Sequence, residues 1–367
     1  MDTLTHALSG AVLGRLMVRP GHAAHPGRLR VAQAVLAGTA AAAFPDIDFV
    51  LGYVSEIAYL RGHRGVTHSV LMAPLWALLL AWLMAGISRL ARDGTRPWRA
   101  FYPVALGGLL IHIAGDWITQ FGTMMLAPFS DRRFGLGTTF IIDLVISGLL
   151  LGGLAASALW RSSRVPAALA LAGVAGWVGI SWVGRGEALD AGRAYAAAHG
   201  VPVVELDAAP RPASPFNWTV ILFDGADYHV AHLNTRRREP LAAGPDDHFI
   251  RRFSAPYQPV HLAEWTRVPK FGNGAAQGLA RNVWAADGFA FFRWFAMFPV
   301  LDHAAAETPD GQQCAGFRDL RFDIPQRDHQ PFRYGLCGRT DEGPWRLYAL
   351  ADGGRRWLDG GGALAAE

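Results

Sequence analysis

The chain has 367 residues, of which 51% are hydrophobic and only 17% are charged. An average soluble domain carries about 25% charged residues, so this composition argues against a protein that is soluble throughout, and the length leaves room for two domains. The formal net charge is +4. No basic run is interleaved with aromatic residues, which argues against nucleic-acid binding.

The long apolar runs all fall in residues 1–184. Because a membrane helix needs about 20 mostly apolar residues, we expect a helical membrane bundle of about six transmembrane helices. The expected spans lie at about 3–18, 31–51, 67–88, 100–119, 138–160 and 165–184. The second is interrupted by Pro45, Asp46 and Asp48, which predicts a kink or a helix end after Phe44.

Arginines are distributed unevenly over the connections between these spans. Ten fall on one side of the expected bundle: Arg15, Arg19, Arg28, Arg30, Arg89, Arg92, Arg96, Arg99, Arg161 and Arg164. Four fall on the other side: Arg61, Arg64, Arg132 and Arg133. By the positive-inside rule the ten-arginine side is cytoplasmic. The start of the chain does not resemble a cleavable signal peptide, so we expect a multi-pass protein of the bacterial inner membrane, in contact with the lipid bilayer.

Acidic and imidazole side chains gather at the non-cytoplasmic ends of the expected spans. The set comprises His6, Asp46, Asp48, His63, His68, His112 and Asp116, followed by Asp131 and Asp143. Such residues are costly at membrane depth unless something pairs with them. A divalent metal suits this mixture of donors. We therefore predict one or two divalent ions, with zinc the expected metal, and the predicted ligands are His6, Asp46, His63, His68, His112, Asp116 and Asp143.

Two pairs in this set have informative spacing. His112 and Asp116 are four residues apart and share one face of a helix, where they could hold one metal or form a hydrogen-bonded pair. Asp46 and Asp48 flank one residue at an expected helix end, where they could chelate a cation, or one of them could cap the next helix. Neither pair decides between metal binding and structural pairing without its neighbours.

The segment His63–Arg64–Gly65–Val66–Thr67–His68 adds a cation to two imidazoles. Thr67 is a candidate N-cap for the following helix, which would leave His68 in its first turn. Arg64 is the natural contact for a phosphate or carboxylate group. The alternative is an interfacial loop whose arginine extends to lipid headgroups.

The last two carboxylates also have alternative interpretations. Asp131 could serve the metal site, or it could pair with Arg132 or Arg133. Asp143 lies among Ile and Leu, so burial would require a metal, an arginine or a histidine as its partner.

Residues 185–367 read as a mostly antiparallel β-rich domain of six to eight strands, delivered to the extracytoplasmic side. A short helix is expected at 187–200, a linker or loop at 209–216, and hairpins at 219–234, around an Asp-Gly pair, and at 331–350. Residues 289–300 and 356–361 are compatible with strands and turns. Cys314 and Cys337 could be buried thiols, or a disulfide if this half is extracytoplasmic.

The ordered motifs TLTHALSG, FPDIDF, HRGVTHS, HIAGDWITQFGT and PFSDRRFGLGTTFIIDL resemble the YdjM-like family of predicted inner-membrane metal-dependent hydrolases. The resemblance covers about residues 1–185, and it implies a metal site at the His and Asp positions of these motifs. Family members commonly have Ser-Tyr-Gly-Thr where this chain has Thr119-Gln120-Phe121-Gly122-Thr123, and Asp-Pro where it has Asp143-Leu144. A more distant similarity is to helical zinc phospholipase C and nuclease enzymes.

The sequence therefore predicts a membrane-embedded metal-dependent hydrolase that acts on a phosphoester of a lipid or lipid-linked substrate. Asp48 or Asp131 would act as general base, and Arg64 would hold anionic oxygens. Two alternatives stay open. One is a non-catalytic membrane protein that binds or transports a divalent metal, and the other is a scaffold whose buried pairs only stabilise the bundle.

Overall fold

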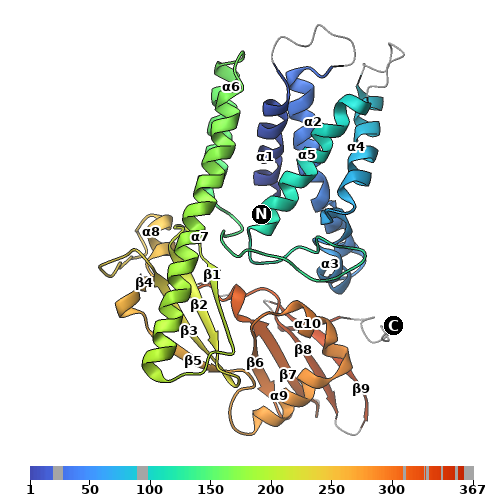
Figure 1. Ribbon diagram of the computed structural model, residues 1–367. Coiled ribbons are helices and arrows are strands. Elements are labelled where there is room, and N and C mark those ends of the chain that lie inside the picture. The colour runs from blue at the N-terminus through green and yellow to red at the C-terminus, as the bar shows by residue number, and fades with distance from the viewer. Residues whose placement is uncertain are drawn as a thin grey trace. The chain divides into compact units, whose positions relative to one another are not determined.

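The computed structural model describes residues 1–19, 28–88, 98–308, 311–325, 327, 330–339, 342–351 and 354–358. The chain divides into two compact units, shown in Figure 1. Unit 1 comprises Met1–Val54 and Gly62–Gly184, and unit 2 comprises Ser55–Arg61 and Arg185–Glu367. Of the arginines counted for topology, Arg89, Arg92 and Arg96 lie outside the described residues.

Unit 1 is helical. Its elements are α1 (Thr3–Met17), α2 (Val31–Ala43), the 3-10 helices η2 (Phe44–Tyr53) and η3 (Val66–His68), α4 (Ala73–Ile87), α5 (Trp98–Trp117), α6 (Leu144–Leu159) and the first part of α7 (Val165–His199). The short helix α3 (Glu56–Gly62) belongs mainly to unit 2. In Figure 1, helices α1, α2, α4 and α5 run side by side. Their contact is filled by small and branched apolar side chains, including Ala41, Ala77, Ala105 and Leu109.

Helices α1 and α2 approach each other closely because glycines face each other. A Cβ on Gly38 would lie 2.2 Å from the carbonyl oxygen of Gly10, and a Cβ on Gly10 would lie 2.2 Å from that of Gly38. Small residues at such a contact let two membrane helices pack backbone to backbone. This packing brings the first turns of α1 beside the end of α2, where the α-helix changes to the 3-10 helix η2 at Phe44.

The outer surface of unit 1 is apolar. On α4 the side chains of Leu75, Leu79, Trp82 and Leu83 are exposed, and an exposed apolar surface of this kind marks contact with a membrane or another protein.

The expectation of six membrane spans is not supported. Among the described residues, only Val31–Tyr53 and Val165–His199 form helices long and apolar enough to cross a membrane. A third span results if Glu56–His68 and Ala73–Ile87, which meet at a bend of 79°, cross together. For α1, α4 and α6 the reason is length, since they have 15, 15 and 16 residues, fewer than the roughly 20 that a span needs. Helix α5 has 20 residues but includes Arg99, His112 and Asp116 and is not apolar enough.

Unit 2 contains two sheets of five described strands each, so the expected six to eight strands were too few. The first sheet has β1 (Glu205–Pro210), β2 (Asn217–Phe223), β3 (Asp227–Asn234), β4 (Gln258–Pro259) and β5 (Trp265–Pro269). The second has β6 (Pro299–Ala305), β7 (Gln313–Asp319), β8 (Tyr334–Arg339), β9 (Glu342–Ala351) and β10 (Gly354–Trp357). All described pairings are antiparallel except that of β3 with β4.

Both expected hairpins are present, as β2–β3 and β8–β9. The expected short helix at 187–200 is the last part of α7, which runs without a break to His199. Residues 290–295, expected to be strand or turn, instead form α10 (Ala290–Phe295). This helix packs with α9 (Ala276–Ala285) on the second sheet, while α8 (Phe249–Ser254) follows the first sheet's β3 along the chain.

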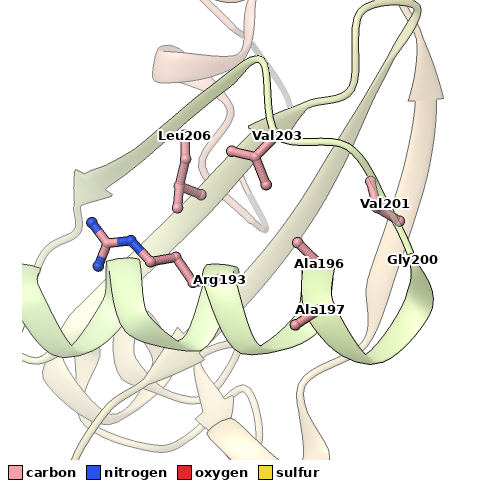
Figure 2. Close-up of a pocket in the computed structure, with 7 residues that line it drawn as sticks. All are labelled: Arg193, Ala196, Ala197, Gly200, Val201, Val203 and Leu206. Carbon is pink, nitrogen blue, oxygen red and sulfur yellow. The ribbon is translucent and has the colours of Figure 1, made fainter.

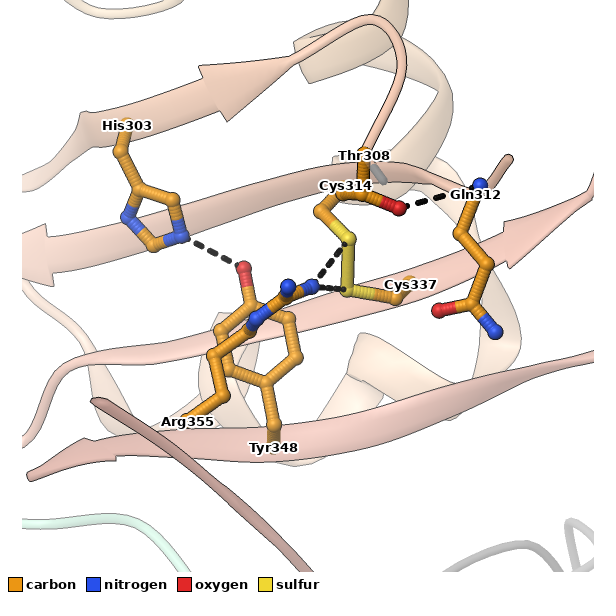
Figure 3. Close-up of a disulfide and its surroundings, with 7 residues drawn as sticks. All are labelled: His303, Thr308, Gln312, Cys314, Cys337, Tyr348 and Arg355. Carbon is orange, nitrogen blue, oxygen red and sulfur yellow. Dashed lines mark hydrogen bonds between the residues drawn. A yellow bond between two sulfur atoms is a disulfide. The ribbon is translucent and has the colours of Figure 1, made fainter. Parts of the chain in front are cut away.

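The two cysteines form a disulfide. Cys314 on β7 and Cys337 on β8 are directly paired across the strands, with Cα atoms 4.2 Å apart. Figure 3 shows the Arg355 guanidinium beside both sulfur atoms, at 2.7 and 2.9 Å. Of the two interpretations that the sequence left open, the structure therefore has the disulfide.

A row of four residues crosses the second sheet next to this disulfide. His303 pairs with Gly316, Gly316 with Gly335, and Gly335 with Tyr348. The His303 Nε2 and the Tyr348 hydroxyl meet at 2.6 Å, as Figure 3 shows. A Cβ on Gly316 would lie 2.3 Å from the imidazole, and one on Gly335 would lie 2.3 Å from the phenol oxygen. Only glycine at both positions leaves room for this hydrogen bond.

A pocket of about 640 Å³ lies between the last turns of α7 and the start of β1 (Figure 2). Its wall is mainly aliphatic, with Ala196, Val203 and Leu206 among the lining residues and Arg193 as the charged one. The Arg193 guanidinium pairs with Asp190 at the surface. The pocket contains no residue that the sequence predicted to be functional.

Candidate metal centre

Four side chains in unit 1 converge on one point. Asp46 comes from η2, His68 from η3, and His112 and Asp116 come from successive turns of α5. One ligand atom from each lies within 4.8 Å of the others. In the part of the chain that the structure describes, this group could hold a metal ion.

The separations within the group fit a small tetrahedral ion. Asp116 Oδ2 lies 3.2 Å from His68 Nε2 and 3.4 Å from His112 Nε2. Asp46 Oδ1 lies 3.6 and 3.7 Å from the same two nitrogens. Ligand atoms bonded to a tetrahedral zinc at about 2.0–2.1 Å lie about 3.3–3.4 Å apart. These four nitrogen–oxygen separations are close to that value, and all four donor atoms lie within 4.8 Å of one another.

Three of these atoms are buried without a hydrogen-bond partner: His68 Nε2, His112 Nε2 and Asp116 Oδ2. Buried polar atoms are rarely left unpaired, so three at one point call for a missing partner. The other ring nitrogens are anchored, because His112 Nδ1 lies 2.6 Å from the Ala42 carbonyl oxygen and His68 Nδ1 lies 3.3 Å from Asp48 Oδ2. Anchoring of this kind directs the Nε2 lone pairs to the common point, as outer partners of metal-binding histidines do. The residues fit a divalent metal.

Asp48 lies beside the group and holds its neighbours. Its Oδ1 is 2.9 Å from His63 Nδ1, and its Oδ2 accepts the backbone N–H of Arg64 at 2.9 Å. Thr67 does not cap a helix as expected, because α4 begins only at Ala73 and the Thr67 hydroxyl faces Asp48 at 3.4 Å instead. Asp48 and His63 thus lie beside the centre, but neither belongs to the four-residue group, although the sequence predicted His63 as a ligand.

Arg64 is buried against the centre. Its Nη2 lies 2.8 Å from Asp116 Oδ1, and its Nη1 donates to the Thr119 hydroxyl at 2.9 Å. The Nε has no hydrogen-bond partner among the described residues. The backbone φ of Arg64 is +60°, a conformation that non-glycine residues rarely adopt. Arg64 therefore neutralises and orients Asp116 and retains one unused donor.

His6 also contacts the non-converging oxygen of Asp116. Its Nε2 lies 3.1 Å from Oδ1, and its ring stacks on His112 with centroids 3.7 Å apart. The close packing of α1 on α2 delivers it there. His6 supports two members of the group and is not itself one of the four.

Two further predicted site residues, Asp143 and Asp131, also lie outside the group. Asp143 caps α6, where its Oδ1 accepts the backbone N–H groups of Val145 and Ile146 at 2.9 and 3.1 Å. Its other oxygen accepts the Trp177 indole N–H at 2.9 Å. From the sequence, a buried Asp143 was expected to need a metal, an arginine or a histidine as its partner. In the structure these three N–H groups satisfy the carboxylate instead. Asp131 is exposed in the segment between α5 and α6.

Sequence reasoning missed three groups that position the donors. One is the Met1 ammonium, which contacts Asp116 Oδ1. The Thr3 hydroxyl donates to Asp46 Oδ2 at 2.6 Å, and the Ala42 carbonyl holds His112. A carbonyl has no signal in the sequence. Thr3, in the motif TLTH three residues before His6, could have been considered because hydroxyls often orient ligating carboxylates.

Comparison with known proteins identifies the helical half. A family model described as YdjM inner membrane protein matches residues 1–188. A protein of Bacillus subtilis (strain 168), described as "Uncharacterized protein YfhP", is 29% identical over 177 residues, which cover 45% of this chain and 48% of that protein. The chain thus spans about half the length of this relative. No solved structure matches the chain. Because the family match covers more than half of the chain and includes all four converging residues, the chain belongs to the YdjM inner membrane protein family.

Proposed function

We propose that the protein is a membrane-embedded hydrolase that uses a divalent metal, with zinc as the expected ion, to cleave a phosphoester of a lipid or lipid-linked substrate. One observation supports this most strongly: three buried ligand atoms without hydrogen-bond partners converge with an oxygen of Asp46, all within 4.8 Å of one another. Mixed imidazole and carboxylate donors are typical of zinc. A bound ion would supply Lewis acidity, which polarises an ester oxygen and makes water more acidic.

In this proposal His63 and Asp48 move the proton. Asp48 Oδ1 holds His63 at Nδ1, at 2.9 Å, and a carboxylate in that position orients an imidazole for general acid–base catalysis. The His63 side chain is 17% exposed, against 4% for Asp48, so the imidazole is the member that a substrate can approach. Asp48 then acts through His63, and Asp131 is the second candidate for the base.

Arg64 supports a phosphoester as the target. Phosphoryl transfer depends mainly on positioning and on neutralising charge. Arg64 lies 2.8 Å from Asp116 and retains an Nε donor without a partner among the described residues. That donor could bind an anionic oxygen of the substrate.

The surroundings of the centre support a lipid substrate. The 3-10 helix η2 carries Asp46 and Asp48, and between and after them Ile47, Phe49 and Val50 are exposed. Apolar side chains beside a polar centre suit a substrate with acyl or prenyl chains. The proposal also puts the centre and unit 2 on the extracytoplasmic side of the inner membrane, and the Cys314–Cys337 disulfide supports that side, since disulfides persist in oxidising compartments.

The test combines metal analysis with turnover. The purified full chain is assayed by elemental analysis, and then with phospholipid vesicles and a soluble chromogenic phosphodiester, with and without a chelator. The wild type is expected to carry stoichiometric metal and to release product only when metal is present. His63→Gln should keep the metal and lower kcat by about 10²–10⁴-fold, the usual contribution of a general base.

His261→Gln is the matched control, because His261 lies in unit 2 outside the cluster. It should leave both readouts unchanged. Stoichiometric metal without turnover of either ester would favour the non-catalytic metal-binding or metal-transporting alternative. If the purified protein carries no metal and binds none when metal is added, the proposed metal centre is wrong and the scaffold interpretation remains.

A further inference from the structure

A second pocket lies in unit 1, at the ends of α1 and α5 that are far from the metal centre. Its volume is about 540 Å³, within the roughly 300–1,000 Å³ typical of small-ligand sites. It is lined by the end of α1 at Met17, by Leu29 ahead of α2, and by the first turns of α5 at Pro103 and Val104. On α1 and α5 the centre's His6 and Asp116 occupy the other ends. This pocket is therefore a separate site.

Among the described residues, three arginines and no Asp or Glu line this pocket. They are Arg19, Arg28 and Arg164. The described contacts of Arg164 include a hydrogen bond from Nη1 to the Leu16 carbonyl at 3.3 Å, which fixes it at the end of α1. Within the described part of the chain none of the three forms an ion pair with Asp or Glu. A pocket with three such charges attracts an anion.

A fourth arginine fixes this arrangement from inside. Arg15 is 3% exposed, and its Nη2 donates to the carbonyls of Arg161 and Ser163 at 3.0 and 2.5 Å. These bonds tie the last turn of α1 to the segment that carries Arg164. The Nη1 of Arg15 is buried without a hydrogen-bond partner. The positive charge at this end of unit 1 is thus built into the packing.

Helix ends add to the positive potential. α2 begins at Val31, three residues after Arg28, and α7 begins at Val165, directly after Arg164. α5 begins at Trp98, two residues before the lining residue Ala100. The start of each helix carries a partial positive charge that favours anions.

The rest of the wall is apolar, which argues for an amphiphile rather than a free ion. Met17, Val18 and Leu29 face the same space as the arginines. Beside Arg164, the α7 side chains of Val165 and Leu169 are 59% and 66% exposed. We propose that this pocket binds the phosphate headgroup of an anionic glycerophospholipid, with the arginines on the phosphate and the acyl chains along α7. Basic pockets between membrane helices are known to suit such headgroups. The inference does not depend on the proposed hydrolase activity.

The test compares lipids on the full chain. The protein is purified in detergent, and its binding of phosphatidylglycerol, phosphatidylcholine and inorganic phosphate is measured by native mass spectrometry and by thermal shift. Phosphatidylglycerol should bind at least about tenfold more tightly than phosphatidylcholine, and inorganic phosphate should neither bind measurably nor displace it. The triple variant R19Q/R28Q/R164Q should remove that preference.

The matched control is R30Q/R99Q/R161Q. It removes the same charge from the same end of unit 1, but none of its residues lines the pocket. It should keep the preference for phosphatidylglycerol. A second variant, Ala100→Leu, fills the pocket without changing charge and should also weaken binding. Equal loss in the triple variant and in the control would overturn the proposal, as would equal affinity for the two lipids or competition by inorganic phosphate.

Discussion

The Asp116 carboxylate has two oxygens with different tasks. Oδ1 is held by His6 at 3.1 Å and by Arg64 at 2.8 Å, whereas Oδ2 has no hydrogen-bond partner and faces His68 and His112. One oxygen thus fixes the carboxylate and leaves the other to a ligand. The Arg64 guanidinium and the Met1 ammonium both contact Oδ1 and stabilise the buried carboxylate, so Oδ2 is the oxygen left to bind a further cation.

The contrast with Asp143 gives the first prediction. Asp116→Ala should abolish stoichiometric metal, because it removes one of four donors. Asp143→Ala should retain the metal and lower stability by about 1 kcal/mol, the usual cost of a lost helix cap. Elemental analysis and thermal unfolding of both purified variants measure this. If the Asp143→Ala variant loses its metal, Asp143 is a metal ligand, as the sequence predicted.

His232 in unit 2 supplies a prediction for pH. Burial, with the Arg211 charge nearby, lowers the pKa of His232 to about 4. Arg211 Nε donates to the Thr219 hydroxyl at 2.6 Å, which leaves that hydroxyl to donate to His232 Nδ1 at 2.9 Å and keeps the ring neutral. An unfolded histidine titrates near pH 6.5. Stability is therefore fully present above about pH 6.5 and falls as the pH drops toward 4, by up to about 3 kcal/mol.

The measurement is unfolding of the full chain between pH 8 and pH 4. His232→Gln, which can still accept from Thr219, should flatten the pH dependence in that window. Identical slopes for wild type and variant would show that another group is responsible.

At this scale the four converging residues are all among the predicted ligands, but the sequence did not separate them from the other candidates or say what each residue does. The four-residue spacing of His112 and Asp116 indicated a shared helix face, and both belong to the group. Asp46 and Asp48 are equivalent by sequence, yet Asp46 faces the imidazoles and Asp48 holds His63. That division depends on how the 3-10 helix η2 turns after Phe44, which local sequence does not specify. The sequence predicted Asp143 as a ligand because it shows neither that this carboxylate caps α6 nor that it accepts the Trp177 indole N–H.

At the level of helices, the glycine contact of α1 with α2 is open to a direct test. Gly38→Ala puts a Cβ 2.2 Å from the Gly10 carbonyl oxygen, so it should destabilise the protein by about 1–3 kcal/mol. Gly148→Ala on α6 meets no atom within 4 Å and should be neutral or stabilise by up to about 1 kcal/mol. Thermal unfolding of the two variants checks the pair. Equal effects would contradict the close packing.

Element types were predictable where the pattern was unambiguous. The Asp-Gly pair predicted the β2–β3 turn, and Gly225 there has φ +106°. The run at 289–300 was read as strand because aromatic residues favour sheets. In the structure Phe291, Phe292 and Phe295 are buried on one helical face of α10 against the second sheet, so tertiary packing decided its form. Helix lengths in unit 1 were overestimated because apolar residues continue beyond the helix ends into turns.

For the molecule as a whole, the side of the membrane on which unit 2 lies can be measured. If unit 2 is extracytoplasmic, as proposed, alkaline phosphatase fused after it should be active in cells. The Cys314–Cys337 thiols should then resist alkylation unless a reductant is added. A fusion to green fluorescent protein at the same point should be dark under Sec-dependent export. An inactive phosphatase, together with cysteines that are alkylated without a reductant, would show that unit 2 lies on the cytoplasmic side instead.

The His303–Tyr348 hydrogen bond joins strands that are not neighbours. It requires β6 to pair with β7, β7 with β8 and β8 with β9, each in one alignment. A slip of one residue in any of the three pairings would send a side chain to the opposite face and replace a glycine under the ring with a residue that has a Cβ. The hydrogen bond between the imidazole and the phenol therefore reports on the register of three strand pairings at once. It can form only after the last of the three has reached its native register.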